Sequence, residues 1–166
     1  MPVPQPVASV CVSIVSHDHG QAVARLLDQL AALDEKGLRR VILTLNVPEP
    51  DLAAAIAGRA WPFDLSIIVN AEVKGFGANH NQAFAGDAKS THADAFAVLN
   101  PDIVLRGNPF GALLRQLNGG DVRVGLVYPV QETSAGRRQD HERRLPTPLR
   151  LLRRHLAAAT HNEVGA

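Results

Sequence analysis

Runs of β-branched and aliphatic residues alternate along this chain with segments whose apolar residues recur at helical spacing, and this alternation constrains the fold most strongly. A strand is expected at residues 7–15, and residues 21–37 follow with one apolar helical face formed by Val23, Leu26, Leu27, Leu30 and Leu33. Apolar strands that are separated by helices are typical of parallel sheets covered on both faces. The sequence therefore predicts an α/β fold with a mostly parallel central sheet and helices on both faces.

The same alternation continues to about residue 130. Further strands are expected at residues 39–47, 63–70, 95–105 and 122–130, and further helices at residues 49–59, 79–88 and 108–118. Asn108 is expected to cap the last helix, with Pro109 at its first position. With 166 residues, the chain has the length of one ordinary globular domain.

Basic residues are concentrated near the C-terminus. Residues 137–154 hold seven arginines against Asp140 and Glu142, a net charge of +5 in a chain whose total is +1. We therefore divide the chain into an α/β domain at residues 1–135 and a basic, Leu/Arg-rich segment at residues 136–166. The segment is either a membrane-surface amphipathic helix or a solvated helix or tail. It lacks aromatic residues for base stacking, so no nucleic acid partner is expected.

Localisation is indicated by two features of the sequence. No apolar run approaches the roughly 18 residues of a membrane span, and the start "MPVPQPVAS" does not resemble a signal peptide. The expected location is the cytoplasm. The single cysteine, Cys11, lies in an apolar run, which predicts a buried thiol and no internal disulfide.

Four polar loops follow the predicted strands, at residues 16–20, 46–50, 70–81 and 100–102. In parallel sheets ligands bind outside the carboxyl ends of the strands, where the strand order reverses. The third loop contains two glycines, Lys74, Asn79 and Asn81, a composition that favours an anion such as a diphosphate. The alternative is a loop whose glycines serve only to turn the chain.

The sequence "LNPDI" directs attention to Asp102. The X-Pro step before it favours extended backbone, which would display the carboxylate just past the strand end. One carboxylate and the nearby Asn100 would suit Mg²⁺ or Mn²⁺ if phosphate oxygens and water supplied the other ligands. The alternative is that Asp102 caps a turn through its own backbone.

Other motifs are incomplete. Gly75 and Gly77 begin a dinucleotide-binding pattern, but His80 stands where glycine or alanine is needed. His17 and His19 lack a third and fourth zinc ligand at suitable spacing. A phosphate-binding G-K-[ST] sequence and a G-x-S-x-G nucleophile elbow are both absent, which argues against those two classes of enzyme.

Taken together, six stretches resemble the N-terminal, donor-binding half of a family 2 glycosyltransferase with the GT-A fold, and most closely its rhamnosyltransferase-like branch. The resemblance extends from about residue 9 to residue 154 and lies in "VSIVSHDHG", "VILTLNVPE", "KGFGANHNQAF", "VLNPDIVL", "VGLVYPV" and "RRLPTPLRLLRR". It implies a Rossmann-like nucleotide-binding half of a larger fold.

The resemblance also implies a set of donor-binding residues: Ser16, His17, Asn46, Lys74, Gly75, Asn79, Asn81 and Asn100. Ser16, His17 and Asn46 would border the nucleotide base and ribose, and residues 74–81 would approach the sugar and diphosphate. Asp102 stands at the place of the family's Asp-x-Asp metal motif, with Asn100 where the first Asp is often found. A divalent ion, Mg²⁺ or Mn²⁺, is the implied cofactor.

The reaction implied is an inverting, metal-assisted displacement that moves a sugar from a nucleoside-diphosphate donor to a glycan or lipid-linked acceptor, in bacterial surface polysaccharide synthesis at the inner face of the membrane. The family's general base lies in a second half with a Gly-Gly-Phe-Asp-like stretch and a Glu-Asp pair. Neither follows Val130. Catalytic residues are therefore left unassigned.

Three readings stay open from the sequence. The chain is an active transferase or its donor-binding half, a non-catalytic nucleotide-sugar-binding module or inactive truncated fragment, or an unrelated α/β domain whose basic tail contacts a membrane. A sheet that ended after the donor-binding half would expose an apolar edge, so self-association or a partner chain that completes the fold is expected. The residues do not distinguish one sugar or nucleotide from another.

Overall fold

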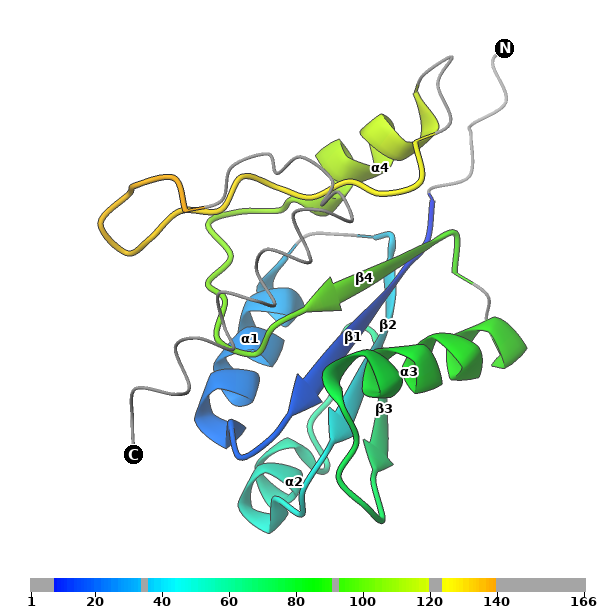
Figure 1. The fold of residues 1–166 in the computed structure, drawn as a ribbon, viewed down its shortest axis with the longest axis vertical. Helices are drawn as coiled ribbons and strands as arrows, with labels where there is room; N and C mark the ends of the chain where they lie inside the picture. The colour runs from blue at the N-terminus through cyan, green and yellow to red at the C-terminus, as the bar shows by residue number, and fades with distance from the viewer. Residues whose placement is uncertain (1–7, 34–35, 91–92, 120–123, 140–166) are drawn as a thin grey trace, which may run out of the picture. The chain divides into compact units, whose positions relative to one another are not determined.

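The computed structural model of the chain describes residues 8–33, 36–90, 93–119 and 124–139. Within them it contains four strands and four helices: β1 (Val10–Ser16), α1 (Gly20–Ala32), β2 (Leu38–Leu45), α2 (Pro50–Ile56), β3 (Asp64–Val69), α3 (Phe76–Ser90), β4 (Ala95–Leu99) and α4 (Phe110–Asn118). The strands form one sheet in the order β3-β2-β1-β4, and every pairing is parallel (Figure 1). The predicted α/β class is confirmed.

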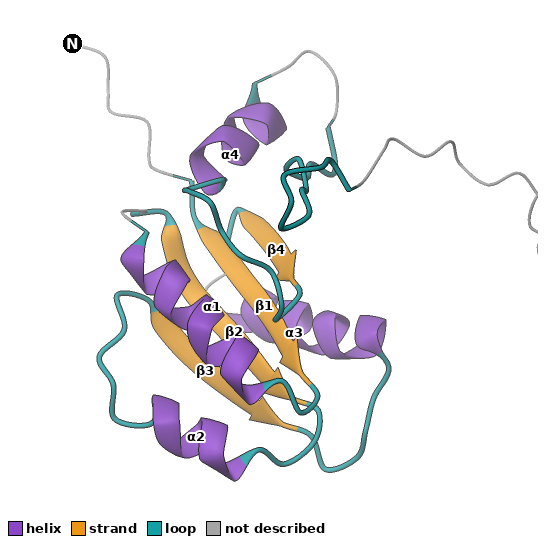
Figure 2. Cartoon of the chain, turned by 90° about the vertical axis from the view of Figure 1, so that its left-hand side faces the viewer, coloured by secondary structure: helices purple, strands orange, loops and turns teal. Residues whose placement is uncertain are grey.

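The path of the chain creates a point where the strand order reverses. The chain runs outward from β1 to β2 and β3, and then returns past β1 to form β4 on its other side. Helices α1 and α2 cover one face of the sheet, and α3 covers the opposite face (Figure 2). The prediction of helices on both faces is therefore confirmed, and the reversal lies between β1 and β4.

The two faces of the sheet have different interiors. On the α1 side, the alternate residues Val10, Val12 and Ile14 of β1 pack against the buried aliphatic face of α1. On the α3 side the sheet is more polar, and Ser13 Oγ lies 2.8 Å from Nδ1 of the buried His80 of α3. The apolar part of that layer is smaller and is built around Cys11, Ile42 and Ala83. Burial raises the pKa of the Cys11 thiol to about 12, so the thiol is protonated.

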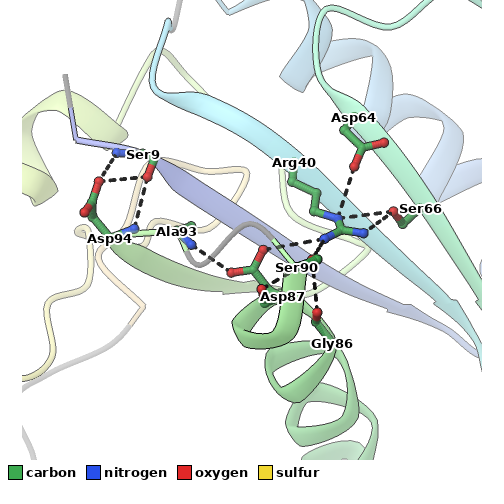
Figure 3. A network of polar contacts seen from close by, with 9 residues as sticks. All are labelled: Ser9, Arg40, Asp64, Ser66, Gly86, Asp87, Ser90, Ala93 and Asp94. Carbon is green, nitrogen blue, oxygen red and sulfur yellow. Dashed lines mark hydrogen bonds and ion pairs between the residues drawn. The ribbon is translucent and has the colours of Figure 1, made fainter. Parts of the chain in front are cut away.

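A polar network joins β2, β3 and α3 at the start of the strands (Figure 3). The Arg40 guanidinium on β2 lies 3.2 Å from the Asp64 carboxylate and 3.9 Å from that of Asp87, and it also donates to Ser66 and Ser90. Asp87 is buried, and its other oxygen accepts the N–H of Ala93 just before β4. One arginine therefore connects α3 to β2 and β3.

Several elements differ from the sequence prediction. Strand β4 ends at Leu99, so residues 100–105 of the strand predicted at 95–105 form a turn and loop. Helix α4 begins at Phe110, so Pro109 stands at the N-cap position instead of Asn108, whose Oδ1 accepts the N–H of Phe110.

Residues 124–131 form no strand, and Leu126 and Tyr128 are 81% and 58% exposed, so the predicted fifth strand at residues 122–130 is wrong for the described residues. A segment with high β-propensity forms a strand only where it can pair with the edge of a sheet and pack one face against other residues. This largely exposed stretch does neither. Helix α3 begins at Phe76 rather than at residue 79, so Gly77 belongs to its first turn.

The chain divides into two compact units, Met1–Tyr128 and Pro129–Ala166. In the described part of the second unit, Glu132 and Arg138 form an antiparallel bridge around a turn that contains Gly136. Most of the predicted basic segment, from residue 140 onward, lies outside the described residues. Among the described helices, none is long and apolar enough to cross a membrane.

Replacement of Arg40 by methionine removes a cationic partner from the buried Asp87 carboxylate. We expect Arg40→Met to lower the free energy of unfolding by about 3 kcal/mol, because a buried carboxylate that loses its partner pays its desolvation cost. Urea denaturation would measure this change. The control is Asp28→Asn, which breaks the exposed Arg59–Asp28 pair and should cost under about 1 kcal/mol. Equal losses in the two variants would contradict the prediction.

His80 predicts a specific dependence of stability on pH. Burial lowers the pKa of its imidazole below the ordinary value of 6.5. The unfolded chain therefore binds a proton that the folded chain does not, and stability falls as the pH drops below about 6.5, by at most about 1.4 kcal/mol per pH unit, until the folded-state pKa is passed. Thermal unfolding measured between pH 8 and pH 4.5 should show a weaker dependence of stability on pH for His80→Gln than for the wild type. The same dependence in both proteins would refute the attribution of this effect to His80.

Candidate functional site

A cavity of about 310 Å³ lies at the carboxyl ends of β1 and β4, where the strand order reverses. It is lined by Val15, His17, His19, Asn46, Phe76, Asn79, Asn100, Pro101 and Asp102. Val15 belongs to β1, and the other residues come from the loops after β1, β2 and β4 and from the first turn of α3. Parallel sheets bind ligands at such positions because the loops on either side of the reversal diverge and leave a crevice.

Asn46 organises one wall of this cavity. Its Oδ1 accepts the backbone N–H of Lys74 at 2.8 Å, and its Nδ2 donates to the backbone carbonyl of the same residue at 3.0 Å. Oδ1 also accepts from Asn70 at 2.9 Å, and the second Nδ2 hydrogen faces Nδ1 of His17 at 3.1 Å. All four hydrogen-bonding positions of this amide are occupied within the protein, so Asn46 shapes the cavity and has none left for a ligand.

Two further asparagines complete the same arrangement. The buried Asn70 donates both to Asn46 and to Oδ1 of Asn79, the latter at 2.7 Å. Asn79 Nδ2 in turn donates to the Lys74 carbonyl at 3.2 Å. We call Asn46, Asn70 and Asn79 the asparagine clamp. It holds the loop before α3 by the backbone of Lys74, so the course of that loop depends little on the Lys74 side chain.

The clamp also determines the tautomer of His17. The amide orientation of Asn46 is set because its oxygen must face one backbone N–H and its nitrogen one backbone carbonyl. Asn46 Nδ2 is therefore the donor toward His17, and Nδ1 of His17 is the acceptor. The proton of the neutral imidazole then resides on Nε2. The exposed His17 ring can thus donate one hydrogen bond to a ligand in the cavity.

Asn100 and Asp102 form the opposite wall. They belong to a turn after β4 in which the N–H of Ile103 approaches the carbonyl of Asn100 at 3.5 Å. Asp102 is exposed, and its carboxylate makes no hydrogen bond or ion pair with any residue in the described part of the chain. The alternative that Asp102 caps its own turn is therefore not observed, and both of its oxygens are available to a ligand.

The structure brings together five of the residues proposed from the sequence and separates the others from the cavity lining. The five are His17, Asn46, Asn79, Asn100 and Asp102. Of the rest, Ser16 is buried and accepts the N–H of His19 at 3.3 Å, and Lys74 Nζ donates to Gln82 at 2.6 Å. Gly75 lies in the clamped loop, and Asn81 is exposed on α3 without lining the cavity.

Phe76 is one of four lining residues that the sequence prediction did not include, the others being Val15, His19 and Pro101. Its ring is 57% exposed and meets His80 edge-on, with 4.4 Å between the ring centroids. The sequence signal for Phe76 was its position between two glycines, Gly75 and Gly77. In the structure neither glycine has a positive φ, and a Cβ at either would meet no protein atom within 4 Å. Neither backbone conformation nor packing requires these glycines, which leaves room for a ligand beside the aromatic ring.

The donor set limits how a metal ion could be held. Within the described residues, no group of three His, Cys, Asp or Glu side chains is placed to bind one ion. A zinc site at His17 and His19 would therefore have no third protein ligand among the described residues. Asp102 offers a carboxylate without a protein partner, which suits an ion such as Mg²⁺ that takes one or two carboxylates and completes its octahedron with water and phosphate oxygens.

Comparison with known proteins adds no relative to this picture. No protein-family model matches the chain, and no curated protein matches it significantly. A proposal about function therefore rests on the fold, on the geometry of the cavity and on the resemblance noted in the sequence.

The asparagine clamp can be tested by a change of one atom. Asn46→Asp removes the donor to the Lys74 carbonyl and places a charge beside it, so we expect a loss of about 2–3 kcal/mol in the free energy of unfolding. Amide exchange at residues 71–75 should accelerate as well. The matched control is Asn81→Asp, an exposed position that should change stability by less than about 0.5 kcal/mol. A variant Asn46→Asp as stable as this control would refute the clamp.

Proposed function

We propose that this chain binds a nucleoside-diphosphate sugar in the cavity between β1 and β4, as the donor site of a glycosyltransferase. One observation carries the proposal: an unpartnered carboxylate, Asp102, faces a cavity whose other wall is pre-organised by the asparagine clamp. A carboxylate without a partner suits a cation, and the Nε2–H of His17 together with the N–H groups at the start of α3 suits an anion. A metal-bound diphosphate supplies both.

Recognition of the diphosphate would rest on groups that are available to a ligand. The Nε2–H of His17 is one donor, by the tautomer derived above. The first turn of α3 adds backbone N–H groups whose approach is not obstructed at Gly75 or Gly77. Lys74 would contribute positive charge from the clamped loop once its ammonium left the neutral Gln82 amide. The exposed Phe76 ring offers a flat apolar surface against which a sugar could pack.

Asp102 is the residue that would hold Mg²⁺ or Mn²⁺, with the Asn100 side chain beside it. Such an ion, when bound with the donor, neutralises negative charge on the diphosphate leaving group. The remaining coordination positions would belong to phosphate oxygens and water. The protein's own part is to place one carboxylate opposite the clamped loop and to keep the diphosphate between them.

Transfer would proceed by attack of an acceptor hydroxyl on the anomeric carbon, with inversion, departure of the nucleoside diphosphate and loss of the hydroxyl proton to a base. A base is not assigned among the described residues. The resemblance noted in the sequence supports a glycan or lipid-linked acceptor and a role in bacterial surface polysaccharide synthesis at the inner face of the membrane. Rhamnose as the sugar rests on that resemblance alone.

Calorimetric titration with UDP and with dTDP, each with and without Mn²⁺, tests the donor site. We expect Mn²⁺ to strengthen nucleotide binding, and Asp102→Asn to remove that gain of at least about tenfold, because one charge-assisted metal contact is worth more than about 1.4 kcal/mol. The control is Asp28→Asn on α1, which neutralises another exposed carboxylate. Failure of the folded wild-type chain to bind either nucleotide would refute the proposal. Release of free sugar or transfer to an acceptor would distinguish an enzyme from a binding module.

A further inference from the structure

Glu49 carries a buried negative charge that the donor site does not explain. It directly precedes α2 and is only 8% exposed, yet it forms no ion pair with a described residue. It is also at the N-cap position of α2 without capping that helix through its side chain. Its carboxylate instead reaches the loop after β1, where Oε1 accepts the backbone N–H of Asp18 at 3.1 Å.

The second oxygen of Glu49 lies at the beginning of α1. A Cβ built on Gly20, the first residue of that helix, would be 3.4 Å from Oε2, so the carboxylate lies beside the first turn of the helix. Helix α1 has no capping hydrogen bond from the side chain of His19 and no acidic residue in its first turn. Negative charge near a helix N-terminus is stabilising, and here a residue from another loop provides it.

The loop held by Glu49 separates two cavities. The smaller is the proposed donor cavity, lined by both His17 and His19. The larger, of about 660 Å³, lies between the starts of α1 and α2 and is lined by His19 and by Glu49 itself. Glu49 does not line the donor cavity, so its influence on a ligand there must pass through the loop.

The backbone between the two histidines needs such an anchor. Asp18 has φ 63°, a left-handed conformation that residues other than glycine seldom adopt. On one side of it, the His17 N–H donates to Nδ1 of His19 at 3.2 Å. Because His19 accepts through Nδ1, its neutral ring also carries its proton on Nε2. Asn46 sets the tautomer of His17 and the loop backbone sets that of His19, so both rings are donors. The central N–H of this loop is bonded to Glu49.

We infer that Glu49 is a positioning residue for the donor cavity, a role that rests on the proposed function. It places negative charge beside the start of α1, holds Asp18 in its left-handed conformation and so presents His17 and His19 to the diphosphate. Glu49 does not line the donor cavity, so it would not contact the nucleotide sugar itself. Its negative charge is tolerated in a buried place because a backbone N–H and a helix N-terminus both face it.

The test uses the full chain with UDP and Mn²⁺ as the probe. Glu49→Ala removes both the acceptor and the charge, and we expect about tenfold weaker UDP binding and faster amide exchange at Asp18. Glu49→Gln keeps an acceptor oxygen and should restore most of the affinity. The matched control is Asp51→Asn, an exposed carboxylate that lines the same larger cavity and should leave both quantities unchanged.

A spectroscopic measurement separates positioning from a general loss of stability. Nitrogen-15 shifts of the imidazoles report the tautomer, and in the wild type we expect the Nε2–H form at His17 and His19. Glu49→Ala should give mixed tautomers at these two rings while the signals of the buried His80 stay as in the wild type. If Glu49→Ala does not fold, Glu49→Gln is compared with Asp51→Asn by the same readouts, and a slight increase in Asp18 exchange in Glu49→Gln alone supports the inference.

The outcomes separate this inference from the proposed function. Wild-type binding of UDP together with unchanged affinity and unchanged tautomers in folded Glu49→Ala would overturn the positioning role and leave the donor site intact. Absence of nucleotide binding in the wild type would overturn the donor site and, with it, the positioning of a donor. Unchanged Asp18 exchange in Glu49→Ala would overturn the anchoring of the loop in either case.

Discussion

The pairing of one side-chain amide with one peptide unit is the interaction on which the candidate site depends. Asn46, at the end of β2, offers an oxygen to the N–H of Lys74 and a nitrogen to its carbonyl, as a neighbouring strand would. The loop before α3 is thereby held without a strand of its own. The remaining hydrogen-bonding positions of the amide fix Asn70 and the tautomer of His17, so one residue joins the loop after β3 to the loop after β1. A buried amide with every position satisfied is rigid, because any rearrangement leaves a polar group unpaired.

The two ends of the sheet carry different kinds of polar contact. At the amino ends of the strands, Arg40 joins β2 and β3 to the end of α3, and Asp87 connects α3 to the start of β4. At the carboxyl ends, the loops carry exposed polar groups such as His17 and Asp102 that have capacity for a ligand. This arrangement lets α3 be anchored at its last turn while its first turn contributes to a cavity. The Arg40 network and the candidate cavity therefore lie at opposite ends of the sheet.

The loop after β1 shows how a site can depend on residues that never reach it. Ser16, Asp18 and Glu49 do not line the candidate cavity, yet the Asp18–Glu49 and His19–Ser16 hydrogen bonds hold the loop that carries the two histidines. The sequence alone gives no reason for a carboxylate at position 49. In the structure that carboxylate lies beside the first residue of a helix that has no side-chain cap. Such indirect residues are invisible to motif reasoning, because their role is defined by a neighbour that lies far away along the chain.

Hydrophobic periodicity in the sequence determined the α/β class, the first four strands and the helices between them, because burial of an apolar face is a property of local spacing. It also determined that His17, Asn100 and Asp102 follow strands that end at one edge of a parallel sheet. Only the tertiary structure decided that the side chains of Asn46 and Asn79 bind the backbone of Lys74 and that Asn81 lies outside the cavity lining. It also decided that residues 124–130 form no strand. The physical reason is the same in each case, because hydrogen-bond partners and strand edges come from segments that are distant along the chain. The residue type determines which groups a side chain can bind, and the tertiary structure determines which of those groups lie within reach.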